Sequence, residues 1–133
     1  MRIKSLIQWG VFLMLLYFVA GCTDRMQYAF SGKVFRYPDA KLVNLMHLKG
    51  GCYAELETND SWKNVLDYYK SHMRKKGWSI RVERESVSNP KDDSESSAFL
   101  ALFKDNTGLM IDTYTPVNGG KTQIALFMGD TDE

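Results

Sequence analysis

The sequence predicts an α+β fold: a single antiparallel sheet of about five to six strands with one amphipathic helix packed across one face. One long segment has helical periodicity, and the segments before and after it in the sequence alternate polar and apolar residues. Turn residues separate neighbouring strand segments closely enough for hairpins. Because no parallel crossover is required, one sheet and one helix account for the whole pattern.

The first two strands are predicted to form a hairpin. Residues 42–48 are apolar enough for a strand, Lys49-Gly50-Gly51 indicates a turn, and residues 52–58 alternate in polarity. Tyr37-Pro38-Asp39-Ala40 precedes the hairpin and favours an extended start, because proline restricts the residue before it.

The helix is predicted over residues 59–77. Asp60 or Ser61 can cap its first turn by accepting bonds from unpaired backbone N–H groups. Gly77 can adopt the left-handed conformation that ends a helix. One stripe of the helix is apolar, at the spacing expected for a core-facing surface: Trp62, Val65, Leu66, Tyr69 and Met73.

Four more strands are predicted to form a meander after the helix. The first begins at Trp78 and alternates in polarity, and a polar loop separates it from the next. Asp105-Asn106-Thr107-Gly108 and Asn118-Gly119-Gly120 are typical of tight hairpins. The remaining strands are expected at residues 98–103, 109–115 and 123–128, followed by a frayed acidic tail at 130–133.

The amino-terminal segment has the three parts of a signal peptide. Arg2 and Lys4 are basic, residues 6–18 are apolar, and Val19-Ala20-Gly21-Cys22 ends in a small-residue cleavage site. This site resembles the lipobox of bacterial lipoproteins. The apolar run over residues 6–21, 16 residues long, is short for a transmembrane helix.

The lipobox resemblance implies an organisation and a location. Residues 1–21 would be removed as signal peptide, Cys22 would carry diacylglycerol and a further acyl chain, and residues 22–36 would form a lipidated tether to a domain at 37–129. Two or more acyl chains hold a protein firmly at a membrane. Because Thr23 and not aspartate follows the cysteine, the family's sorting tendency favours the outer membrane, with the domain facing the periplasm.

The mature part is similar to small uncharacterised bacterial lipoproteins, over roughly residues 36–79. This resemblance implies a fold and no activity. The residues that carry it are Tyr37-Pro38-Asp39-Ala40, Thr58-Asn59-Asp60-Ser61, Val65, Tyr68-Tyr69 and Gly77-Trp78.

Composition and motifs argue against several functions. Without residues 1–21 the chain has 15 basic and 16 acidic residues, which is no electrostatic footprint for nucleic acid. No glycine-rich loop opens a helix, so no nucleotide cofactor is expected. His47 and His72 lack partners at the spacing of a zinc site, so no metal is expected.

The chain is not expected to be an enzyme. His47 could meet Cys52 across the predicted hairpin, and a Cys/His pair is the minimum for a thiol nucleophile. No third orienting residue is evident. With Cys22 acylated, Cys52 is the one thiol left, which rules out an internal disulfide, and we interpret it as a small buried apolar residue.

The second face of the sheet is the candidate partner surface. The last strands carry apolar residues on both sides, whereas one helix covers one face. Alternatively, residues 24–36 fold back over the second face with Tyr28, Phe30, Val34 and Phe35, or the sheet curls on itself. The candidate surface consists of Leu100, Leu102, Tyr114 and Phe127.

We therefore predict an accessory module that binds another envelope protein. The alternative is a small-molecule or lipid-binding module whose pocket is the groove between helix and sheet, lined by Trp62, Tyr69 and Trp78.

Overall fold

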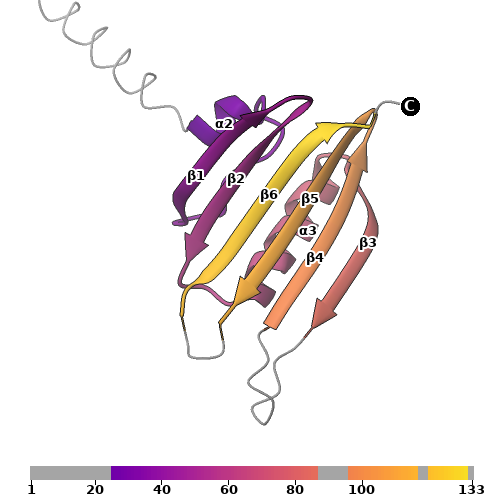
Figure 1. The fold of residues 1–133 in the computed structure, drawn as a ribbon. Coiled ribbons are helices and arrows are strands. Elements are labelled where there is room, and N and C mark those ends of the chain that lie inside the picture. The colour runs from indigo at the N-terminus through magenta and orange to yellow at the C-terminus, as the bar shows by residue number, and fades with distance from the viewer. Residues whose placement is uncertain (1–24, 87–95, 117–119, 132–133) are drawn as a thin grey trace, which may run out of the picture.

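The computed structural model describes residues 25–86, 96–116 and 120–131. They form one six-stranded antiparallel sheet in the order β1-β2-β6-β5-β4-β3, with two helices on one side of it (Figure 1). The elements are α2 (Arg25–Ala29), β1 (Lys41–Leu48), β2 (Gly51–Thr58), α3 (Trp62–Lys75), β3 (Ser79–Ser86), β4 (Ser96–Lys104), β5 (Thr107–Thr115) and β6 (Thr122–Asp130).

The fold is broadly α+β, although most of it is sheet. The predicted hairpin is confirmed, because β1 pairs with β2 and Leu48 lies opposite Gly51. The predicted meander is also confirmed, because β3, β4, β5 and β6 pair in succession. β6 then pairs with β2, which joins the hairpin to the meander in one sheet.

Local signals define the ends of α3. The Ser61 hydroxyl accepts a hydrogen bond from the Asn64 backbone N–H at 3.2 Å, so Ser61 is the cap. At the other end Gly77 has φ +89°, a conformation that residues with a Cβ rarely adopt. The buried residues of α3 are Val65, Leu66, Tyr69 and Met73, and they belong to the predicted stripe.

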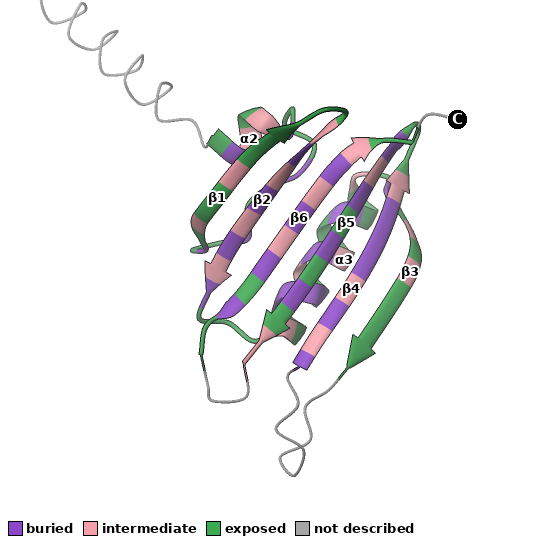
Figure 2. Ribbon diagram, in the orientation of Figure 1, coloured by how far each residue is buried: buried purple, intermediate pink, exposed green. Residues whose placement is uncertain are grey.

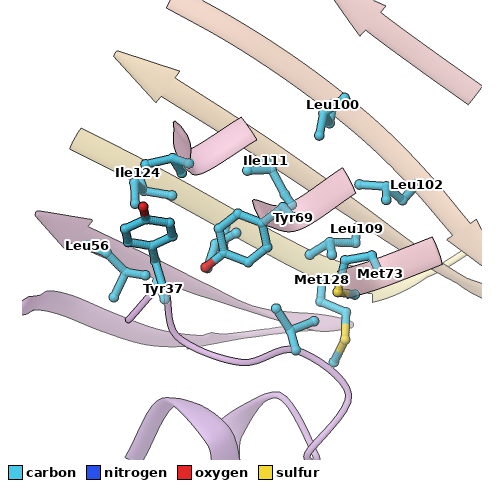
Figure 3. Packing of buried hydrophobic residues seen from close by; sticks show 14 of the residues in the cluster. Tyr37, Leu56, Tyr69, Met73, Leu100, Leu102, Leu109, Ile111, Ile124 and Met128 are labelled. Atoms are coloured by element: carbon cyan, nitrogen blue, oxygen red, sulfur yellow. The ribbon is translucent and has the colours of Figure 1, made fainter. Parts of the chain in front are cut away.

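The core lies between α3 and the sheet and continues beneath β1, β2 and β6. Buried residues alternate with more exposed ones along β2 and β6 (Figure 2). Every second side chain of these strands therefore points into this core. Figure 3 shows Leu102, Leu109 and Met73 packed between the strands and α3. The Tyr37 hydroxyl donates to the Asp60 carboxylate at 2.5 Å, which ties the segment before β1 to the start of α3.

Residues 25–36 are not the tether that the sequence predicts. Met26, Phe30 and Val34 have no exposed surface and belong to the core. The physical reason is that α3 reaches β3, β4 and β5, so the β1–β2 half of the same face needs a second cover. The domain therefore begins at or before Arg25, the first described residue.

The carboxyl end also differs from the predicted frayed tail. Asp130 pairs with Thr107 as the last residue of β6, and the Thr131 N–H donates to the Asn106 carbonyl oxygen at 2.7 Å. Both edge strands carry a bulge, between Leu42 and Asn44 in β1 and between Ile80 and Val82 in β3. Bulges discourage edge-to-edge pairing with other chains. Among the described residues, no helix has the length and apolar character needed to cross a bilayer.

Candidate functional site

The face of the sheet turned away from α3, which we call the open face, carries a continuous apolar row. The register of the five strand pairs places one residue of each strand side by side in this row. Met110, at its centre, is 42% exposed, although its neighbours Leu109 and Ile111 are fully buried. In strand order the row consists of Met46, Tyr53, Phe127, Met110, Ala101 and Val82.

Glycines widen the apolar area next to this row. Gly51, Gly129 and Gly108 lie side by side near the ends of β2, β6 and β5, so no side chain covers the backbone of these three strands there. Two aromatic rings lie next to these glycines. A Cβ on Gly108 would come within 3.3 Å of the Phe103 ring, and a Cβ on Gly129 within 3.4 Å of the Phe127 ring. The result is a flat apolar platform at one end of the open face.

Two acidic side chains lie in the next row of the open face, which ends in Phe99 on β4 and Arg84 on β3. Glu55 and Asp112 both lie opposite Ala125, one on each side of β6. The Tyr53 hydroxyl donates to Glu55 Oε1 at 2.7 Å, and this bond, with burial, raises the pKa of Tyr53 to about 12. Burial raises the pKa of Asp112. On β2 and β5 the open face therefore changes from apolar to acidic along the strands.

The structure divides the four predicted surface residues between the two faces. Leu100 and Leu102 have no exposed surface and lie in the core, so their assignment to an exposed surface is wrong. Tyr114, 37% exposed, and the partly exposed Phe127 lie on the open face. Side chains alternate along a strand, and Leu100 and Leu102 lie opposite Ile111 and Leu109, which are buried in the core.

Sequence reasoning missed the centre of this surface. Met46, Tyr53 and Met110 were not among the predicted residues, yet they lie in the apolar row. Counting register outward from the two-residue turn at Asp105-Asn106 would have placed Met110 opposite Ala101.

The amino-terminal segment does not cover the open face. Phe30 and Val34 have no exposed surface and belong to the same core cluster as the buried residues of α3. The alternative in which residues 24–36 cover the second face is therefore wrong for the described part of that segment, residues 25–36.

Core side chains fill the expected groove between helix and sheet. Tyr69 is 1% exposed and Trp78 4% exposed, and Trp62 packs against the same cluster. The Tyr69 hydroxyl donates to the Phe35 carbonyl oxygen at 3.1 Å, which satisfies its polar atom. Trp62 and Tyr69 therefore contribute to stability here, whereas Trp78, although buried, also borders a hollow beside Lys76 and Lys104 at the end of α3.

Cys52 and His47 lie opposite each other in the β1–β2 register. Cys52 is buried and His47 is exposed. Burial raises the pKa of the Cys52 thiol, which disfavours the thiolate that a nucleophile requires. Within the described ranges, no group of three histidine, cysteine, aspartate or glutamate residues lies close enough to hold a metal ion.

Cys22, the predicted site of lipid attachment, lies outside the described residues. Comparison with models of protein families finds no match to this chain, and comparison with curated proteins finds none either.

Proposed function

We propose that the protein is a bacterial envelope lipoprotein, anchored through acyl chains on Cys22 in the outer membrane, whose domain binds another envelope protein in the periplasm. The lipobox-like Val19-Ala20-Gly21-Cys22 supports the anchor. The apolar row on the open face carries the proposal of a protein partner.

The size and shape of this surface favour a protein over a small ligand. The row crosses all six strands, and a sheet of six strands spaced about 4.8 Å apart is roughly 24 Å wide. A flat apolar area of that extent suits a macromolecular surface, whereas small ligands are held in concave pockets.

The acidic residues beside the apolar row indicate which charges the partner surface would carry. Glu55 and Asp112 lie immediately beside the apolar row, and Glu57 follows on β2. A complementary partner would present an apolar ridge flanked by lysine or arginine, since opposite charges at an interface speed association and exclude wrong partners.

In-cell photo-crosslinking tests the partner proposal. A photoreactive residue replaces Met110 or Phe127 on the open face, and matched controls replace Asp67 or Ser71 on the exposed side of α3. We expect one discrete adduct from the open-face positions and none from the controls, with the partner identified from its mass.

A variant that disrupts the apolar row tests whether the adduct depends on this surface. Met110→Glu adds a charge to the centre of the row, where the side chain is exposed enough for the fold to tolerate it. The adduct at Phe127 should then disappear, whereas Asp67→Lys should leave it intact. Adducts of equal yield from both faces, or an adduct that survives Met110→Glu, would refute the open face as the binding surface.

The anchor is tested separately. A Cys22→Ser chain should leave the membrane fraction after a carbonate wash, because no acyl chain can be attached. Retention of this variant in the membrane would contradict the lipoprotein assignment.

A further inference from the structure

Two turns and the end of β6 meet at one end of the domain, which we call the turn end. The Asp130 N–H donates to the Gly50 carbonyl oxygen at 3.3 Å, which brings the β1–β2 turn beside β6. The Thr131 N–H donates to the Asn106 carbonyl oxygen at 2.7 Å, which adds the β4–β5 turn. In Figure 1 α2 lies at this same end.

Three lysines surround a hollow of about 510 Å³ at the turn end, which we call the lysine pocket: Lys33, Lys76 and Lys104. Lys104 Nζ donates to the Lys76 carbonyl oxygen at 2.6 Å, and Lys76 Nζ lies 3.2 Å from the centroid of the Phe35 ring. Asp105 is the one carboxylate among the lining residues. Positive charge therefore exceeds negative charge in the pocket, which favours an anion.

The pKa of Lys76 is consistent with this crowding. Burial lowers it first, and the nearby charge of Lys104 lowers it further. A bound anion would reduce the repulsion between the two ammonium groups.

The rest of the turn end combines basic and apolar side chains with the exposed Asp130. Lys49 is exposed in the β1–β2 turn. Tyr28 is 84% exposed and Leu48 is 45% exposed. Exposed aromatic and aliphatic side chains among lysines and arginines are typical of surfaces that lie in the headgroup region of an anionic membrane.

The chain itself brings the turn end close to the proposed anchor. Arg25 is the third residue after Cys22, and three residues span at most about 10 Å. Since Met26 is already part of the core, no long tether separates the domain from the acyl chains.

We propose that the turn end docks on the bilayer and that the lysine pocket binds the phosphate of an anionic lipid headgroup. This inference rests on the proposed acylation of Cys22. In this orientation Tyr28 and Leu48 contact the interface, the strands extend away from the membrane, and the open face remains accessible to a protein partner.

A fluorescence-quenching experiment on the acylated full chain tests the docking. An environment-insensitive fluorophore is attached to L48C at the turn end or to N59C at the opposite end, while Cys52 is buried and does not compete. The chain is reconstituted into vesicles of phosphatidylethanolamine and phosphatidylglycerol, or of phosphatidylcholine alone, each with a nitroxide-headgroup lipid. We expect strong quenching at position 48 in the anionic vesicles, much weaker quenching there in the neutral ones, and little quenching at position 59.

Charge variants assign the effect to the pocket. The triple variant K33Q, K76Q, K104Q should lower the ratio of docked to undocked domain about 100-fold, since each lysine near an anionic surface contributes roughly fivefold. The control triple variant K41Q, K63Q, K121Q makes the same charge change at the opposite end and should have no effect. Arginine at positions 33, 76 and 104 should restore docking, which separates loss of charge from loss of structure.

Several results would overturn the docking. The first is equal quenching of the fluorophores at positions 48 and 59. The second is equal quenching at position 48 in neutral and anionic vesicles. The third is an equal effect of the two lysine-to-glutamine triple variants on docking. The mass of the intact chain separates this failure from failure of the anchor: a chain without acyl groups on Cys22 contradicts the proposed function, whereas an acylated chain with indistinguishable probes contradicts only the docking.

Discussion

Replacing Phe30 with alanine measures how strongly the segment before β1 belongs to the domain. Phe30 is fully buried, and truncating a buried phenylalanine typically costs about 3–5 kcal/mol from lost burial and the cavity that remains. A domain of this size has a total stability of about 5–15 kcal/mol. We therefore expect Phe30→Ala to remove about a fifth of the free energy of unfolding or more.

Urea unfolding of the purified chain, followed by circular dichroism, measures this loss. With an m-value of about 2 kcal/mol per molar urea, a loss of about 4 kcal/mol lowers the midpoint by about 2 M. The matched control is Tyr28→Ala in α2, since Tyr28 is 84% exposed and its removal should change stability by less than about 0.5 kcal/mol.

A tether would give a different result. If residues 25–36 were a tether, Phe30→Ala and Tyr28→Ala would have equally small effects. That outcome would refute the packing of this segment in the core, and with it the short connection between Cys22 and the domain on which the docking depends.

Three further predictions concern the helix cap, a phenol and the thiol. Ser61→Ala removes the oxygen that accepts from the Asn64 N–H, so urea unfolding should show about 1 kcal/mol less stability; no change would contradict the cap. Burial and the hydrogen bond to Asp60 raise the pKa of Tyr37 from 10.0 to about 12 in the folded chain, so its stabilising effect is full below pH 10 and is lost as the pH rises through 12. Unfolding measured across this window should show a smaller alkaline loss in Tyr37→Phe than in the wild type, and identical pH profiles would refute the assignment. The Cys52 thiol should react with a disulfide reagent at least about 100-fold more slowly in the native chain than in urea, because it is buried and its pKa is raised; equal rates would exclude this burial.

Most of the secondary structure could be predicted because its signals are local. Alternation of polar and apolar residues indicated the strands, and the helix had both a capping serine and a terminating glycine. The two-residue turn at Asp105-Asn106 made the β4–β5 pairing predictable, since such a short loop allows only neighbouring antiparallel strands.

The surface of the candidate site was predicted less well. Leu100 and Leu102 are as apolar as Met110 and Phe127, so composition does not distinguish the core from an exposed row. Only the phase of each strand relative to its neighbours makes this distinction, because a shift of one residue moves a side chain to the other face.

The sequence by itself determined α3 and the six strands, their antiparallel order within the hairpin and the meander, and the lipobox-like pattern that ends at Cys22, but not α2. The tertiary structure alone decided that β6 joins β2, that residues 25–36 cover half of the sheet, and that three distant lysines line one pocket. These features depend on contacts between residues far apart in the chain. Their energies come from burying shared apolar surface, and a local pattern does not specify which surfaces meet.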